Sequence, residues 1–298
     1  MKKIFSSGLI FMFFAICLQQ VVAQTSAKNY KKEIEAWDQK RLFDLKSATG
    51  WVNLAGLFWL KDGENGFGKD SSNNIVFDHP NFPSFLGKFI VSEKEVRWVT
   101  HPGNQVNIRD KKIDELVIFH VDSLSNPSLS FSTFKWSIIK RENKIGVRFR
   151  DLNNPALTAL TRIDRYPANP AWIINARLET SMFSTIAITN VLGQTTQQAS
   201  LGKLVFQLNK KTYKLDVIDE GPGDMFVIFG DETNGDETYH TGRFLYVSRP
   251  DENGNTTIDF NKSHNPPCAF TTFATCPIPP RQNMLPFRIE AGEKNVHH

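Results

Sequence analysis

The chain lacks the motifs by which most enzyme classes are recognised. It contains no G-x-S-x-G nucleophile elbow, no H-E-x-x-H zinc motif, no G-x-x-x-x-G-K-[ST] phosphate loop and no G-x-G-x-x-G dinucleotide motif. These absences exclude the readily recognised hydrolases, zinc proteases and nucleotide-binding proteins, whereas enzymes without such motifs are not excluded. No stretch of the sequence implies a cofactor.

A strong charge of one sign is also missing. The chain has 35 Lys and Arg against 31 Asp and Glu, which gives a formal net charge of +4 over 298 residues. The two signs are interspersed, whereas nucleic-acid-binding proteins concentrate Lys and Arg on one face. The sequence therefore predicts no nucleic-acid partner.

The apolar run from Ile4 to Leu18 is shorter than the roughly 20 residues that a membrane-spanning helix needs. It follows Lys2 and Lys3 and precedes Val21-Val22-Ala23, a small-residue cleavage signal. This order is typical of a secretory signal peptide. We therefore expect residues 1–23 to be removed, and the protein to be exported, periplasmic or secreted, without a membrane segment after cleavage. A retained N-terminal anchor is the alternative.

Cysteine is scarce, and only Cys268 and Cys276 would remain after cleavage. Their spacing is too wide for a C-x-x-C redox motif or a zinc knuckle, and no second pair or well-placed His completes four ligands. In an oxidising compartment, paired thiols tend to become disulfides. We expect a Cys268–Cys276 disulfide. The alternatives are two free buried thiols, or a catalytic or metal-binding thiolate.

Among the features that are present, the first is a helix. Residues 24–49 are expected to form an N-terminal helix, clearest from Lys28 to Lys46 and ending before Gly50. One stripe at helical spacing is mainly aromatic and apolar, and charged residues cover the other face. The stripe consists of Tyr30, Ile34, Trp37, Arg41, Leu42 and Leu45. It predicts a packing face, so the helix should lie on the outside of the main body.

From Trp51 onward the apolar period changes to two, and Gly, Asn and Pro separate short aromatic and β-branched runs. Two short strands are expected within GWVNLAGLFWL, and further strands at 75–77, 88–91, 95–99, 105–108, 115–120, 134–141, 144–150, 172–178, 185–190, 202–208, 212–217, 225–229, 244–247 and 256–260. The spacing of the turn signals predicts a mainly β fold, with a single large antiparallel sandwich or barrel-like domain over residues 50–298. The Pro- and Asn-rich passage 153–170 is the best candidate for a boundary within it.

The residues that carry chemistry gather between Phe226 and Lys294. Asp231 closely follows the apolar run FVIF, and Arg243 directly precedes FLYV. A strand-loop-strand unit of this kind should bring both side chains to one rim of the sheet. We expect a small polar pocket there, in which Arg243 holds a carboxylate or phosphate through its fork of donors. The alternative is structural, with turn and capping hydrogen bonds and an internal ion pair.

Two functions of different classes fit this pocket. The first is a binding module for a small anionic or sugar-like ligand, with the ligand-binding candidates Thr233, Thr238, Arg243, Asn261 and Asn265. The second is a hydrolase or lyase in which Asp231 or Glu237 is the general base and Tyr239 the acid. A structural envelope protein is a third alternative. The D-x-T-x-G stretch lacks the carboxylates of an EF-hand loop, so no metal is expected.

Three C-terminal stretches resemble a known family. They are FGDETNGDETYHTGRFLY, DFNKSHNPPCAF and TCPIPPRQNMLPFRIEAGEK, and they are similar to the signature of DUF1684, a bacterial and archaeal family of unknown function. The earlier GWVNLAGLFWLKDGENGFG and VRFRDLNNPA extend the resemblance over most of residues 36–294. The chain departs from the family pattern at Gly230, His240 and His264, which argues against an essential proton-transfer role for either histidine. The resemblance implies no activity.

Overall fold

The computed structural model describes residues 28–296, apart from the side chains of Met182 and Phe183. The expected signal peptide, residues 1–23, lies outside this range. The described chain divides into two compact units. Unit 1 contains residues 28–43, Arg162–Ala269 and residues 276–296, and unit 2 contains Asp44–Thr161 and Phe270–Thr275.

Residues 28–46 form one continuous α-helix that ends before Gly50, as expected. Within unit 1 the buried Ile34 faces inward, and the Tyr30 hydroxyl donates a hydrogen bond of 2.8 Å to Asp259. Farther along the helix, Arg41 Nε pairs with the buried Glu293 at 3.1 Å. The predicted packing face is therefore confirmed in unit 1.

Unit 2 contains two sheets and the short helix α2 (Ala156–Ala159). The first sheet has the order β1-β11-β10-β9-β6-β7 and the second the order β3-β2-β4-β5-β8. All pairs are antiparallel except β2 with β3. The strands are β1 (Leu54–Trp59), β2 (Gly63–Gly68), β3 (Ile75–Val76), β4 (Gly87–Val91), β5 (Glu95–Thr100), β6 (Val106–Ile108), β7 (Lys111–Ile113), β8 (Glu115–His120), β9 (Leu129–Phe131), β10 (Phe134–Arg141) and β11 (Lys144–Asp151).

Aromatic side chains join the two sheets of unit 2. Phe67 of β2 meets Phe149 of β11 edge to face at a centroid separation of 5.3 Å. Trp98 of β5 and Trp136 of β10 make a similar contact, also at 5.3 Å. These pairs are among the largest fully buried side chains, and edge-to-face packing suits the ring quadrupoles. Unit 2 is therefore a sandwich around an aromatic core.

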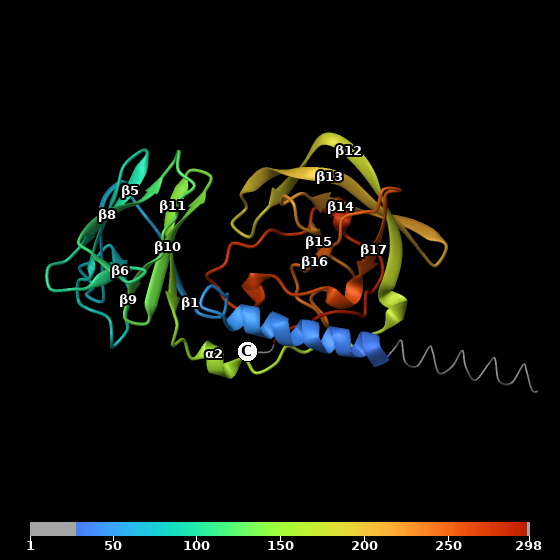
Figure 1. The fold of residues 1–298 in the computed structure, drawn as a ribbon, viewed down its shortest axis with the longest axis horizontal. Coiled ribbons are helices and arrows are strands. Elements are labelled where there is room, and N and C mark those ends of the chain that lie inside the picture. Colours follow the sequence, from blue (N-terminus) through green and yellow to red (C-terminus); the bar gives the residue numbers. More distant parts are fainter. Residues whose placement is uncertain (1–27, 297–298) are drawn as a thin grey trace, which may run out of the picture. The chain divides into compact units, whose positions relative to one another are not determined.

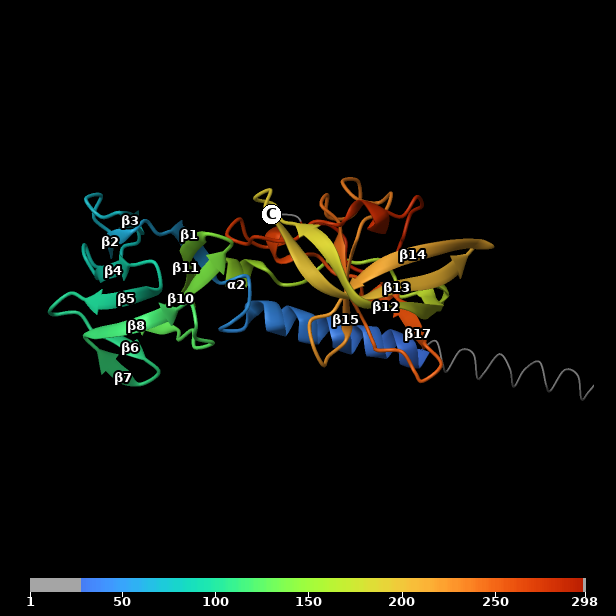
Figure 2. The same cartoon turned by 90° about the horizontal axis from the view of Figure 1, so that it is seen from above.

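Unit 1 contains one six-stranded antiparallel sheet in the order β16-β15-β14-β13-β12-β17. Its strands are β12 (Ile173–Thr189), β13 (Thr195–Leu208), β14 (Lys211–Ile218), β15 (Met225–Phe229), β16 (Arg243–Val247) and β17 (Asn255–Asp259). Short 3₁₀ turns occur at η1 (Pro170–Trp172), η2 (Phe260–Lys262), η3 (Pro267–Ala269) and η4 (Arg281–Asn283). In Figure 1 the long strands β12 and β13 bend together, and Figure 2 shows their twist from above. The sheet is barrel-like.

The core of unit 1 takes every second residue of these strands, as period-two alternation predicts. Ile174, Ala176 and Leu178 of β12 enter it, together with buried residues of the other five strands. The irregular C-terminal segment adds Leu285, Ile289 and Ala291 to the same cluster. This segment therefore forms part of the core of unit 1.

The predicted fold class, mainly antiparallel β with an N-terminal helix, is confirmed. The sequence pattern predicts one domain over residues 50–298, whereas the packing divides this range into two compact units. The difference arises because the buried apolar side chains form two separate clusters. One change of unit, between Thr161 and Arg162, falls within the Pro- and Asn-rich passage that the sequence marks as a boundary candidate.

Across residues 28–296, no helix combines the length and the apolar character needed to cross a membrane.

Candidate functional site

The structure brings Asp231 and Arg243 together, but in the interior of unit 1. Arg243 Nη2 lies 2.6 Å from Asp231 Oδ2, and both side chains are fully buried. The same guanidinium donates to the carbonyl oxygens of Ile289, at 2.9 Å, and Ala291. Its carbon lies 5.3 Å from the centre of the Phe229 ring. The guanidinium group of Arg243, the first residue of β16, is thus enclosed between this strand and the C-terminal segment.

The second oxygen of Asp231 is also satisfied. Oδ1 accepts hydrogen bonds from the Thr233 backbone N–H at 2.9 Å, the Thr233 hydroxyl at 2.6 Å and the Ile289 N–H at 3.1 Å. The buried Thr238 hydroxyl lies 2.8 Å from that of Thr233. Asp231, Thr233, Thr238 and Arg243 therefore do not line the expected pocket, because the C-terminal segment packs over them and uses their hydrogen-bonding groups.

Glu237 lies in a different set of contacts, partly exposed. Its carboxylate accepts from Lys294 Nζ at 2.8 Å and from Arg288 Nη2 at 2.6 Å. The hydrogen bond from Lys294 is the main reason why the pKa of Glu237 is lowered. A carboxylate held in its ionised form by two cations is a weak proton acceptor. The arrangement therefore counts against Glu237 as a general base.

Tyr239 belongs to a third set, beside the two cysteines. Burial raises its pKa to about 12, and the charges of Cys268 and Cys276 act in the same direction. A tyrosine with a raised pKa holds its proton more firmly. The structure thus places the side chains of the three catalytic candidates in different sets of contacts, and among the described residues no hydrogen bond joins the Tyr239 hydroxyl to either proposed base.

The structure shows no disulfide bond between Cys268 and Cys276, which differs from the expectation. They are nevertheless neighbours, because the Cys268 N–H donates to Cys276 Sγ at 3.0 Å and the Cys276 N–H to Cys268 Sγ at 3.3 Å. A hydrogen bond from the Cys276 side chain lowers the pKa of Cys268 to about 7. The pair is therefore positioned for thiol chemistry.

The two candidate amides, Asn261 and Asn265, bridge backbone segments. Asn261 exchanges two hydrogen bonds of 2.9 Å with the backbone of Asn169. Asn265 donates from its side chain to the Lys294 carbonyl at 2.7 Å, and its backbone N–H donates to Glu293 at 2.7 Å. Both amides are fully buried. Their role in the structure is to order loops, which is the alternative that the sequence left open.

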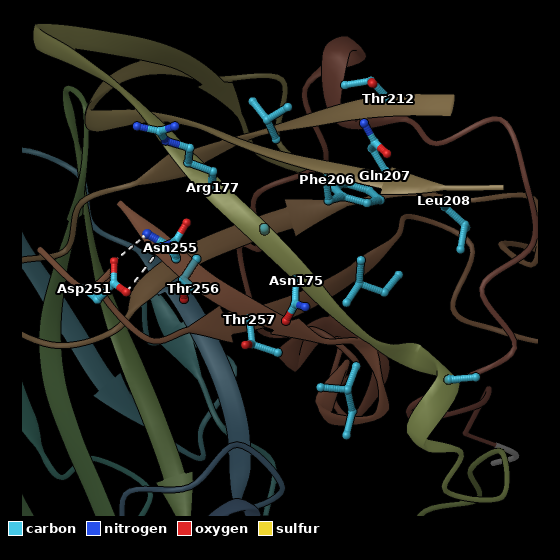
Figure 3. Close-up of a pocket in the computed structure, with 15 residues that line it drawn as sticks. Asn175, Arg177, Phe206, Gln207, Leu208, Thr212, Asp251, Asn255, Thr256 and Thr257 are labelled. Carbon is cyan, nitrogen blue, oxygen red and sulfur yellow. Dashed lines mark hydrogen bonds between the residues drawn. The ribbon is translucent and has the colours of Figure 1, made fainter. Parts of the chain in front are cut away.

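A surface groove of about 1000 Å³ lies elsewhere on unit 1. Figure 3 shows its lining side chains, which come mainly from neighbouring strands of the sheet. The polar residues that line it are Asn175, Arg177, Gln207, Thr212, Asp251, Asn255, Thr256 and Thr257. The groove is a concave surface with the volume and the polar lining that a small ligand needs.

Strand register explains how these residues meet. Arg177 of β12 stands opposite Asn255 of β17, and Asn175 stands opposite Thr257. On the other side, Gln207 of β13 stands opposite Thr212 of β14. Successive side chains of a strand point to opposite faces, so these polar positions alternate with the apolar residues that enter the core. The face opposite the core therefore presents rows of amide, hydroxyl and guanidinium groups.

Most of the polar groups in the groove are available to a ligand. Within residues 28–296, the side chains of Asn175, Arg177 and Gln207 make no hydrogen bond or ion pair. Asp251, in contrast, accepts from the Asn255 backbone at 2.8 Å and from its side chain at 3.4 Å, as Figure 3 shows. The groove is not among the sites that the sequence predicts. The only signal was the alternation of β12, in which Asn175 and Arg177 separate core residues.

No group of three or more His, Cys, Asp or Glu side chains is placed to hold a metal ion anywhere in the described chain.

Residues 158–294 match the model of a family described as "Protein of unknown function (DUF1684)", and the predicted resemblance is confirmed for this range. Among solved structures, the chain is similar to an uncharacterized protein of Haloarcula marismortui determined by solution NMR. The identity is 22%, the match covers 46% of this chain and 78% of that chain, and the TM-score is 0.39. No curated protein matches the chain.

Proposed function

We propose that the protein binds a small anionic or sugar-like molecule in the groove of unit 1. The premise is that residues 158–294 match the DUF1684 family, whose function is unknown. The observation that carries the proposal is the groove itself, with Arg177 free of any partner in the described chain. Ligand sites are typically concave surfaces with a few polar groups that fix orientation. This site replaces the pocket that the sequence predicts at the Asp231–Arg243 loop.

The chemistry of the lining favours this ligand class. Arg177 offers a planar fork of donors that matches a carboxylate or phosphate. Asn175 and Gln207 can each donate and accept, as neighbouring sugar hydroxyls require. Ile173 and Leu208 add apolar surface at one side, which suits the C–H groups of a sugar ring. The ligand we expect is therefore a sugar acid or a similar polyhydroxylated anion.

The test is a thermal-shift screen with glucuronate, galacturonate and sugar phosphates, and with the neutral sugars as comparison. We expect an acidic sugar to raise the melting temperature of the wild-type protein. Arg177→Ala should weaken that binding at least about tenfold, which corresponds to about 1.4 kcal/mol, without changing the melting temperature of the unliganded protein. Arg162→Ala is the matched control, because Arg162 is 81% exposed and lies outside the groove. Equal affinities of the two variants would contradict the proposal.

We also propose that the protein is exported after removal of residues 1–23, and that Cys268 and Cys276 form a disulfide in an oxidising compartment. The sequence order of Lys2, Lys3, an apolar run and Val21-Val22-Ala23 supports export. The adjacency of the two thiols supports the disulfide. Mass spectrometry of the protein from the exported fraction tests both, since it should show a chain that begins at Gln24 and lacks free thiols.

The hydrolase or lyase alternative has less support. Asp231 is neutralised by Arg243 and fully buried, Glu237 is paired with two cations, and Tyr239 lies beside the cysteines. A structural envelope protein is the alternative that a negative ligand screen would favour.

A further inference from the structure

Backbone geometry holds Cys268 and Cys276 against each other. Each residue's N–H points at the other's sulfur, at 3.0 and 3.3 Å. Donors of this kind stabilise negative charge on sulfur, because the thiolate is the better acceptor. Both sulfurs are thus prepared to carry charge, which is the state in which a thiol reacts.

The two thiols differ in access. Cys268 is partly exposed, in the 3₁₀ turn η3, whereas Cys276 is 3% exposed. The hydrogen bond from the Cys276 side chain lowers the pKa of Cys268, so the sulfur of the more exposed residue ionises at a lower pH than an ordinary thiol does. An external reagent therefore meets a thiolate at Cys268 first.

The backbone on both sides of the pair is fixed. Pro266 and Pro267 restrict the chain before Cys268, and the Ala269 N–H donates to the Pro266 carbonyl at 3.0 Å. The Cys276 carbonyl accepts from the Val191 N–H at 2.9 Å, and Pro277 follows directly. Little rearrangement is then needed for the two sulfurs to join, and the bond can open again without unfolding its surroundings.

We propose that Cys268 and Cys276 form a redox-active dithiol that exchanges with low-molecular-weight disulfides, with Cys268 as the sulfur that reacts first and Cys276 as the sulfur that resolves. The site lies apart from the groove residues. It goes beyond the disulfide proposed above, because exchange requires that the bond open as readily as it closes.

The reaction proceeds in two displacements at sulfur. The Cys268 thiolate attacks one sulfur of the small disulfide, whose S–S bond breaks, and one small thiolate leaves as the mixed disulfide forms. Cys276 loses its proton to solvent and attacks the Cys268 sulfur. The mixed S–S bond breaks, the Cys268–Cys276 bond forms and the second small thiolate leaves. The protein is oxidised by two electrons, and the small disulfide is reduced to two thiols.

The experiment uses the reduced mature protein, which begins at Gln24 and has no cysteine besides Cys268 and Cys276, with glutathione disulfide, followed by mass spectrometry. The wild type should lose two hydrogens without retaining glutathione. Cys276→Ser should accumulate one glutathione on Cys268, and Cys268→Ser should react at least about tenfold more slowly. Equal rates for the two variants, or a wild type that stays reduced, would overturn the proposal, and the second outcome would also remove the disulfide itself.

Reversibility separates exchange from a static cross-link. The oxidised wild type should be reduced again, under native conditions, by excess glutathione. A bond that forms but resists this reduction would leave the proposed disulfide intact and overturn exchange alone. Alkylation of the unmodified protein with iodoacetamide avoids any folding effect of the serine substitutions. Its rate at Cys268 should reach half its maximum near pH 7, and first modification of Cys276 would contradict the assignment.

Discussion

Asp231 and Arg243 form an ion pair that is buried in the interior of unit 1. Burying an ion pair costs desolvation energy that is offset only when the remaining donors and acceptors are also satisfied. Here the Asp231 carboxylate accepts from Arg243, Thr233 and the Ile289 N–H. The pair thereby ties the loop between β15 and β16 to the C-terminal segment.

Asp231→Asn should therefore destabilise the protein strongly. It keeps the shape of the side chain but leaves the buried Arg243 without its counter-charge, and breaking such a pair costs about 3–5 kcal/mol. Glu179→Gln is the matched control, since Glu179 pairs with Lys214 at 2.7 Å with both side chains about half exposed, and such pairs contribute at most about 1 kcal/mol. Urea denaturation measures both. Similar unfolding free energies for the two variants would show that the buried pair is not structural.

His264 is a second buried titratable group. Its ring stacks on Tyr246 at a centroid separation of 5.9 Å and lies 6.0 Å from Trp37. Burial, with a further contribution from the positive charge of Arg41, lowers the pKa of His264 from 6.5 to about 3. The folded protein therefore favours the neutral form of the His264 ring.

The folded protein should accordingly lose stability in acid. Between pH 6.5 and about 3 the unfolded chain binds a proton at His264 that the folded chain does not, so the free energy of unfolding falls by at most about 1.4 kcal/mol per pH unit. Above pH 6.5 the group has no effect. His264→Phe keeps a ring and removes the titration, so its stability should fall less steeply. Parallel curves for the two proteins in denaturant titrations at pH 7, 6, 5 and 4 would refute this.

At the scale of elements, the long pair β12–β13 owes its bend to one irregular position. The register of the two strands shifts between Thr180 and Ser184, and that of β13 with β14 shifts between Ser200 and Gly202. Gly202 has a φ of +126°, and a Cβ atom there would collide with the Glu179 carbonyl. A bulge of this kind increases the local bend and twist.

Gly202→Ala should thus destabilise unit 1 by about 1–3 kcal/mol, through backbone strain and overpacking. Gly223→Ala is the control, because a Cβ atom there would meet nothing within 4 Å, and we expect a change within about 0.5 kcal/mol. Thermal unfolding followed by circular dichroism measures the difference. An unaffected Gly202→Ala protein would mean that the bend does not depend on the glycine.

The same irregularity limits what the sequence can predict about elements. The sequence predicts most of the strands correctly, because each of these strands has one apolar face and one polar face. The alternation predicts separate strands at residues 172–178 and 185–190, because the bulge interrupts it, whereas β12 runs through both ranges. The first half of β13, Thr195 to Ser200, was missed because its sequence TTQQAS contains no apolar alternation.

At the scale of the whole molecule, the sequence identifies the class but not the division of the core. Periodicity shows which side chains are buried, but not with which others they pack, so two clusters appeared as one. The sequence could not show, for a related reason, that the Asp231–Arg243 loop is packed in the interior and does not line a pocket. Asp231, Thr233 and Arg243 are the residue types of both a ligand pocket and a packed polar network, and only the position of the C-terminal segment decides between them.

The long-range hydrogen bond and ion pair of the helix of residues 28–46 have a consequence for the order of assembly. Tyr30 and Arg41 bind Asp259 and Glu293, which the ribosome adds more than 200 residues later. The helix can form at once from local contacts, but its partners do not exist until almost the whole described chain has been made. Its docking is therefore a late step in folding, and a chain that stops short of Glu293 would leave the helix without that anchor and open to proteolysis.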